Sequence, residues 1–162
     1  MSKIPLGRPR GQMSESMLTA AFIILSGGFQ DAYTYFFRGK VYANAQTGNI
    51  VLLSQHLFTG DFLKALHYLI PLVAFASGIL AAELFREHFQ SLKALHWRQM
   101  IVLAEILLLF SVGFFPQELN LLANAVVSFS CAMQVQTFRK VSGYAYASTM
   151  CIGNMRGGME AL

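Results

Sequence analysis

The stretch MLTAAFIILSGGFQDAYTYFF, from Met17 to Phe37, decides the fold class. It is apolar as far as Leu25, and about 20 residues are enough for a helix to cross the hydrocarbon core of a bilayer. The segment SGGFQD, residues 26–31, does not suit a surface that faces lipid all round. We therefore expect a first membrane span that is broken at Gly27-Gly28 and carries a carboxylate.

The composition extends this expectation to the whole chain. Of its 162 residues, 55% are hydrophobic and 12% are charged, whereas a soluble domain has about 25% charged residues. We expect an all-α, polytopic transmembrane helical bundle with an internal repeat and a broken or re-entrant second segment. A cytoplasmic tail, residues 1–16, precedes a transmembrane domain, residues 17–162. Its expected spans are 17–38, 66–85, 100–115 and 119–138, with a half-entering or short segment at 41–58 and the start of another at 144–162.

Lys and Arg counts favour the half-entering arrangement of 41–58. In that case the N-terminus, the basic link 86–99 and Arg139-Lys140 share the cytoplasmic face, opposite Arg38, Lys40 and Lys64. If 41–58 spans fully, the N-terminus moves outside and the bias weakens. Both arrangements make the lipid bilayer the main partner of the chain and put most of its basic residues on the cytoplasmic side.

Two helical faces carry information about packing. Ala74, Gly78 and Ala82 recur every four residues, which lets a neighbouring helix approach closely. A polar stripe in 119–138, with members three or four residues apart, must face protein or water. The stripe either joins helices by hydrogen bonds or lines a cavity. Its members are Asn120, Asn124, Ser128, Cys131 and Gln134.

A weak internal echo appears when Gly48-Asn49 is laid over Gly153-Asn154. Tyr33 then overlies Phe138, and a basic pair follows each of these aromatic residues. The half-entering arrangement makes the two units inverted repeats, and full spanning makes them parallel. Transporters often place their sites where such repeats meet. The second unit is incomplete, so we expect a truncated chain.

The combination of GFQDA at 28–32, ANAQTGN at 43–49, MQVQT at 133–137 and Gly153-Asn154 resembles the YoaK family of small bacterial membrane proteins. The resemblance covers nearly the whole chain. It implies a helical membrane protein, and it implies members longer by a couple of helices, in agreement with the expected truncation. It implies no particular reaction.

Asp31 is the sharpest candidate for chemistry, because a carboxylate within a membrane segment is costly and usually functional. Its alternative role is interfacial, as a cap for the next turn. Glu105 is a second intramembrane acid and a candidate proton carrier. The glycines and the amide side chains near Thr47 can recognise a polar solute, or they can satisfy the backbone of a re-entrant turn. The expected ligand-binding residues are Gly28, Gln30, Asp31, Asn44, Gln46, Thr47, Gly48, Asn49, Glu105, Asn124, Gln134 and Asn154.

Other classes of function lack their signatures. The histidines and the two cysteines, Cys131 and Cys151, show no metal-ligand spacing, and no cofactor motif or nucleophile–base arrangement is present. The basic residues lie beside apolar runs, which argues against nucleic acid. We expect no enzyme, but a carrier of a small polar solute or ion, or alternatively a non-transporting assembly or accessory protein. The sequence leaves a homo-oligomer open.

Overall fold

The computed structural model describes residues 13–90, 96–141, 144–146, 154–156 and 159, and these residues are mostly helical. The all-α prediction is confirmed at this level. Five α-helices follow one another: α1 (Met17–Phe37), α2 (Gln46–Phe58), α3 (Phe62–Phe89), α4 (Trp97–Val112) and α5 (Asn120–Thr137). Short 3₁₀ turns, η1 (Met13–Glu15) and η2 (Gln117–Leu119), precede α1 and α5.

The segment after α5 differs from the prediction. Strands β1 (Lys140–Val141) and β2 (Tyr144–Ala145) pair antiparallel, with Lys140 opposite Ala145. The expected helical segment at 144–162 therefore does not begin at residue 144. Asn154 lies in a helical turn, residues 154–156, and Gly153 of the internal echo lies outside the described residues, as do residues 1–12 of the expected tail.

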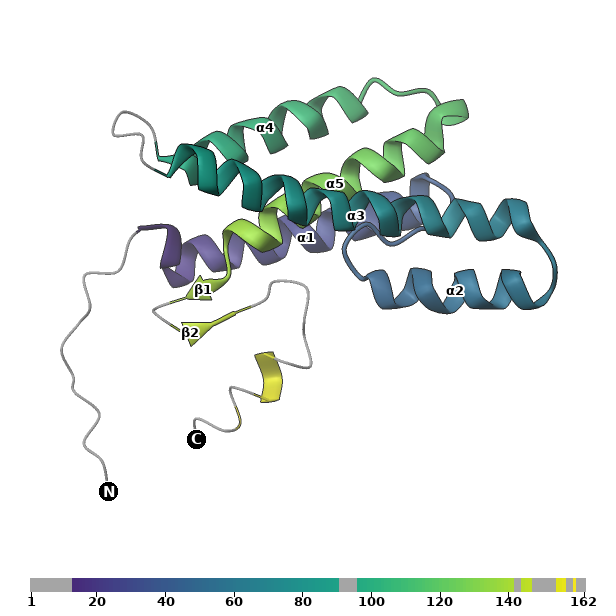
Figure 1. Cartoon of the computed structure of the whole chain (residues 1–162), viewed down its shortest axis with the longest axis horizontal. Helices are drawn as coiled ribbons and strands as arrows, with labels where there is room; N and C mark the ends of the chain where they lie inside the picture. The colour runs from purple at the N-terminus through teal and green to yellow at the C-terminus, as the bar shows by residue number, and fades with distance from the viewer. Residues whose placement is uncertain (1–12, 91–95, 142–143, 147–153, 157–158, 160–162) are drawn as a thin grey trace.

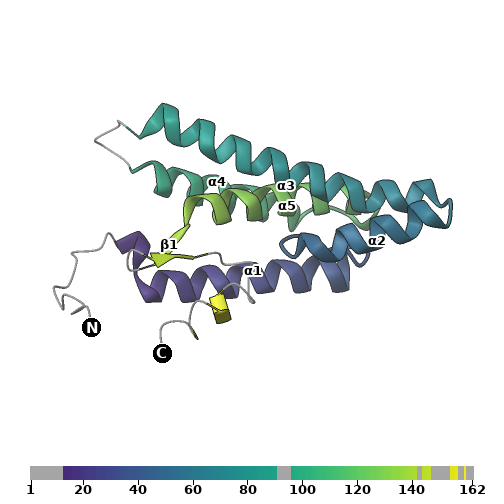
Figure 2. The same ribbon diagram turned by 60° about the horizontal axis from the view of Figure 1, so that its bottom comes forward.

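Helix α5 is the centre of the bundle, because it contacts α1, α3 and α4 (Figure 1). Helix α3 packs along α5 with one half and against α2 with the other. Helices α1 and α2 run in the same direction, and α3 returns past both of them (Figures 1 and 2). The N-terminal end of α1, the C-terminal end of α3, the N-terminal end of α4 and the C-terminal end of α5 consequently lie at one end of the bundle. This grouping is the one that the charge counts favoured.

The expected break in α1 is wrong. The helix runs without interruption through Gly27-Gly28, from its N-cap Ser16, whose hydroxyl accepts the Thr19 N–H at 3.1 Å. A glycine within a helix costs only about 1 kcal/mol relative to alanine, which does not break a 21-residue helix that packs on a neighbour. Gly27 is buried because the side chain of Asn44 lies against it.

Capping residues move the ends of the next two spans. Helix α3 begins at Phe62, before the expected residue 66, since Asp61 caps it by accepting the Lys64 N–H at 3.2 Å. It contains Pro71 well inside and continues past Phe85. Helix α4 lies three residues earlier than expected, because His96 and Gln99 form a capping box at its start.

The small-residue face of α3 packs as expected. A methyl group added to Gly78 would overlap the Phe129 carbonyl and the Ala132 side chain of α5, and Ala82 is buried in the same interface. Among the described helices, α3 is the one long and apolar enough to cross a membrane by length and composition.

Candidate functional site

The polar stripe of α5 faces the interior of the bundle. Asn124, Ser128, Cys131 and Gln134 are all buried, and Asn120 is half-buried. Most of these side chains bond to other helices, which supports the role of the stripe in joining helices. Ser128 Oγ, Asn124 Oδ1 and Gln134 Oε1 have no hydrogen-bond partner among the described residues.

Glu105 is the acidic centre of this interior. It is 4% exposed, and its Oε1 accepts hydrogen bonds from Gln134 Nε2 at 2.7 Å and from Gln30 Nε2 at 3.3 Å. Gln30 also donates to Ser26 Oγ at 2.9 Å and accepts from Cys131 Sγ at 2.8 Å. We call these five residues from α1, α4 and α5 the Glu105 cluster. Within the described residues no Lys, Arg or His forms an ion pair with Glu105.

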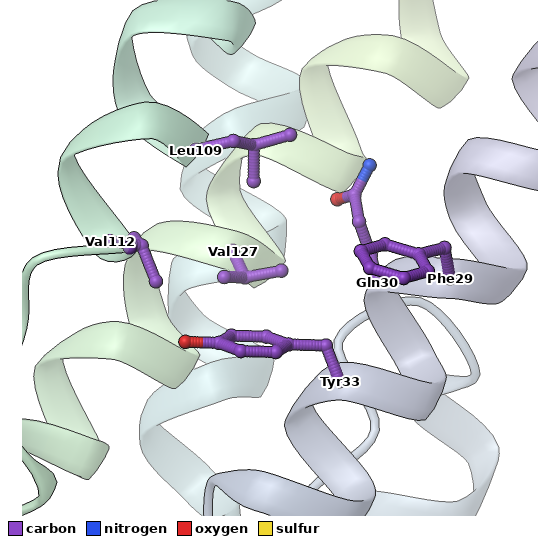
Figure 3. Close-up of a pocket in the computed structure, with 7 residues that line it drawn as sticks. Phe29, Gln30, Tyr33, Leu109, Val112 and Val127 are labelled. Atoms are coloured by element: carbon purple, nitrogen blue, oxygen red, sulfur yellow. The ribbon is translucent and has the colours of Figure 1, made fainter.

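An apolar cavity of about 250 Å³ adjoins this cluster between α1, α4 and α5. Figure 3 shows the Tyr33 ring on one side, Leu109 opposite it and the Gln30 amide at the edge. Gln30 thus belongs to both the cavity wall and the Glu105 cluster. The remaining lining residues are Phe29, Val112, Gly113 and Val127.

Asp31 holds a loop that turns back along α1. After Arg38 the chain reverses, so that the backbone N–H of Asn44 donates to Asp31 Oδ1 at 2.7 Å and that of Ala45 at 3.4 Å. Helix α2 starts at the next residue, Gln46. Asp31 therefore ties the 38–45 loop to the middle of α1. The expected alternative, a cap for the next turn of its own helix, is wrong because α1 continues unbroken past Asp31.

Asn49 and Gln46, in the first turns of α2, hold the same loop by hydrogen bonds to its backbone. Asn49 is fully buried, and its side-chain amide accepts the Tyr42 N–H at 3.0 Å and donates to Tyr42 O at 2.5 Å. It also donates to Gln46 Oε1 at 2.8 Å, while Gln46 Nε2 donates to Ala43 O at 2.7 Å. These amides satisfy backbone groups of the loop.

Replacing Asn49 by alanine is expected to lower the free energy of unfolding by about 2 kcal/mol, because the N–H and C=O of the half-buried Tyr42 lose their partners. Thermal unfolding in detergent, followed by far-UV circular dichroism, measures the change. Thr47→Ala is the control, since Thr47 is exposed two residues earlier on the same helix and should change stability by less than about 0.5 kcal/mol. Equal shifts for the two variants contradict the assigned role of Asn49.

The other expected site residues are scattered. Gly28 is exposed, and a side chain there would meet nothing within 4 Å. Gly48 packs under the Tyr42 ring. Asn124 Nδ2 donates to the Arg38 carbonyl at 2.7 Å, and Asn154 is half-buried in its helical turn. The structure therefore joins Gln30, Glu105 and Gln134 in one cluster, and Asp31, Asn44, Gln46 and Asn49 in the loop.

Arg38 is the important residue that the sequence interpretation assigned only to topology. It is 4% exposed, and its guanidinium donates to Tyr33 Oη at 2.7 Å and Phe115 O at 2.9 Å. It also donates to Asn120 Oδ1 at 3.1 Å, Pro116 O at 3.2 Å and Val112 O at 3.3 Å. One clue was present in the sequence, because Arg38 directly follows an aromatic helix end where a buried cation can meet a neighbouring helix C-terminus.

In the described part of the chain, no group of three His, Cys, Asp or Glu side chains could hold a metal ion.

The family model described as "Protein of unknown function (DUF1275)" matches residues 19–162. No curated protein and no solved structure matches the chain.

Proposed function

The chain belongs to the DUF1275 family, and we propose that it is a multi-pass protein of the bacterial inner membrane, of the YoaK type. In this proposal it carries a small polar solute or ion, and Glu105 exchanges the coupling proton. The observation that carries the proposal is a buried carboxyl group, bonded by two amides from different helices and facing no cation among the described residues.

The membrane setting is supported by large apolar side chains on the outside of the helices and by polar groups inside the bundle. Large apolar side chains are exposed on the helices, including Phe22, Phe29, Leu80 and Phe110, each at least 60% exposed. The interior contains an apolar core, and beside it carboxyl, amide, hydroxyl and guanidinium groups. Such a distribution suits hydrocarbon as the surrounding solvent, because lipid covers apolar side chains and polar ones must find partners inside.

The proposed topology has four crossings, α1, α3, α4 and α5, and a half-entering α2. Because Asn44 lies against Gly27, the 38–45 loop reaches the middle of α1. Irregular backbone at such depth is tolerated where protein covers it, and the bonds from Asp31, Gln46 and Asn49 satisfy this loop. The N-terminus, the α3–α4 link and Arg139-Lys140 then face the cytoplasm.

An inverted repeat fits this topology. Helix α1 and helix α5 run antiparallel (Figure 1), and each supplies an interior glutamine to Glu105. We propose that they are the first helices of two related units. Transporters built from inverted repeats place their sites between the units near the midplane, where the Glu105 cluster would lie.

Proton binding changes what the cluster can hold. The ionised Glu105 carboxylate only accepts hydrogen bonds, whereas the protonated form also donates one. Protonation therefore frees one glutamine N–H group or supplies a donor to the unpartnered Gln134 Oε1. Either change alters the contact between α1, α4 and α5 beside the cavity, and so couples the proton to the opening of a path.

The proposal is tested by proton flux in sealed vesicles that contain the protein and an internal pH-sensitive dye. Small polar metabolites are added one by one, and the expected result is proton movement with at least one of them. Glu105→Gln should reduce this flux by at least about tenfold, since a removed proton carrier cannot be replaced by an amide.

Glu118→Gln is the matched control, because Glu118 is exposed in the α4–α5 turn. It should leave the flux unchanged. Melting midpoints of both variants in detergent separate loss of carriage from loss of folding, and Glu105→Asp, which keeps an acid, should retain part of the flux. Undiminished flux in folded Glu105→Gln overturns the role of Glu105.

A second candidate is a non-transporting assembly or accessory protein. It is favoured by the observation that Asn49 and Arg38 bond to other parts of the chain and line neither described cavity. In that case no metabolite moves protons or raises the melting midpoint, while Glu105→Gln still lowers the midpoint. Under either candidate we propose that the chain is not an enzyme.

A further inference from the structure

We propose that the cavity between the N-terminal ends of α1 and α4 binds the phosphate of an anionic phospholipid headgroup. The inference rests on the proposed membrane setting, but it is independent of carriage and of the Glu105 cluster. The cavity lies at the N-terminal ends of α1 and α4, which share one end of the bundle (Figure 2), and it has a volume of about 290 Å³. It is lined by Ser14, Thr19, Arg98, Gln99, Val102 and Phe138.

The chemistry of this lining divides into two parts. Arg98, Gln99 and the hydroxyl groups of Ser14 and Thr19 are of the kind that hold phosphate oxygens. In this structure Arg98 donates to Ser14 Oγ, and the Thr19 hydroxyl is bonded to that of Ser16, so a phosphate would exchange these bonds for its own. Val102 and Phe138 are apolar and suit the first carbons of an acyl chain. A cavity lined by both polar and apolar side chains fits a lipid better than it fits a free inorganic ion.

The electrostatics favour an anion. Helices α1 and α4 both begin at this cavity, so the positive ends of two helix dipoles meet there. Arg139, which is exposed, follows α5 at the same end. Basic pockets between membrane helices on the cytoplasmic side are suited to anionic lipid headgroups.

Trp97 places the cavity at the level of the headgroups. The Arg98 guanidinium carbon lies 5.5 Å from the centroid of the Trp97 ring, and tryptophan is enriched at membrane–water interfaces. The ring thus orients Arg98 at the depth where lipid phosphates lie.

Glu15 occupies the place of the anion in this structure. Its Oε1 lies 3.6 Å from Arg98 Nη2, and each of the two side chains is 19% exposed. The distance is long for a charge-assisted hydrogen bond, so a phosphate with three acceptor oxygens can replace this carboxylate. Glu15 is therefore a competitor, and its removal should tighten lipid binding.

The test is the melting midpoint of the full chain in neutral detergent during titration with phosphatidylglycerol. A ligand that binds the folded state raises the midpoint, and we expect a rise of several degrees with phosphatidylglycerol and none with phosphatidylcholine or inorganic phosphate. Arg98→Gln should raise the half-effect lipid concentration by roughly tenfold, and Glu15→Gln should lower it severalfold.

Lys140→Gln is the matched control, because it removes one exposed positive charge from the same end of the bundle outside the cavity. It should leave the half-effect concentration within about twofold of the unmodified chain. An equal effect of phosphatidylcholine, an equal effect of inorganic phosphate, or unchanged responses in both Arg98→Gln and Glu15→Gln each overturn the proposal. The gain expected for Glu15→Gln cannot arise from misfolding, and failed carriage with intact lipid response would overturn only the proposed function.

Discussion

Replacing Arg38 by methionine is expected to lower the free energy of unfolding by about 3–5 kcal/mol, the cost typical of breaking a buried charged network. Methionine keeps an unbranched apolar chain but removes every donor. The carbonyls of Val112, Phe115 and Pro116 then lose a shared cation at the point where α4 ends and the chain turns into α5.

The size of this effect follows from helix termini. The last carbonyls of a helix lack partners within the helix, and the end carries a partial negative charge. Arg38 supplies five donor contacts from the end of α1, and its own carbonyl accepts from Asn124 at 2.7 Å. One residue thus ties together α1, α4 and α5, which otherwise contact one another mainly through α5.

Lys40→Met is the control for loss of a positive charge in the same loop. Lys40 is exposed and lies 4.8 Å from the Tyr35 ring centroid, so its loss should cost no more than about 1 kcal/mol. Arg38→Lys should fall between the two, because an ammonium group cannot reach five acceptors in a planar fork. Thermal unfolding in detergent measures all three, and equal midpoints for Arg38→Met and Lys40→Met would refute the role of Arg38.

Arg38 also shows where sequence interpretation fails. Charge counting assigns an arginine in a short loop to the membrane surface, but four of the five acceptors of Arg38 lie more than seventy residues away in the chain. No local pattern announces such partners. The same limit explains the extra length of α3, whose ends are set by the Asp61 cap and by packing rather than by where apolar residues stop.

Local sequence patterns predicted helix bounds and buried helix faces more reliably than they predicted contacts between distant residues. The expected bounds of α1 and α5 agree with the structure to within one residue at each end, and the α5 stripe is buried as its spacing predicted. The predicted break in α1 was wrong, because two glycines weaken a helix but do not end it when a loop packs against one of them. The sequence predicted Glu105, Gln30 and Gln134 as site residues. That both glutamines donate to the same oxygen of Glu105 depends on how the helices pack, which the sequence alone does not reveal.

The small-residue face of α3 gives the second large effect, and Gly78→Leu should lower the free energy of unfolding by upwards of about 3 kcal/mol. Even one added carbon would overlap the Phe129 carbonyl. That atom belongs to the α5 backbone and cannot rotate away as a side chain end can. The two helices must therefore separate, and α5 carries contacts to α1 and α4 as well.

Gly28→Leu is the matched substitution, because it makes the same change in α1 where a side chain meets nothing within 4 Å. Leucine is a better helix former than glycine by up to about 1 kcal/mol, so this variant should melt at or above the midpoint of the unmodified chain. Far-UV circular dichroism during heating in detergent reads both. Opposite signs show that the cost at Gly78 comes from the close approach of α3 to α5, since helix propensity alone predicts a gain at both positions. Similar midpoints for the two variants would mean that α3 does not pack on α5 as closely as Gly78 indicates.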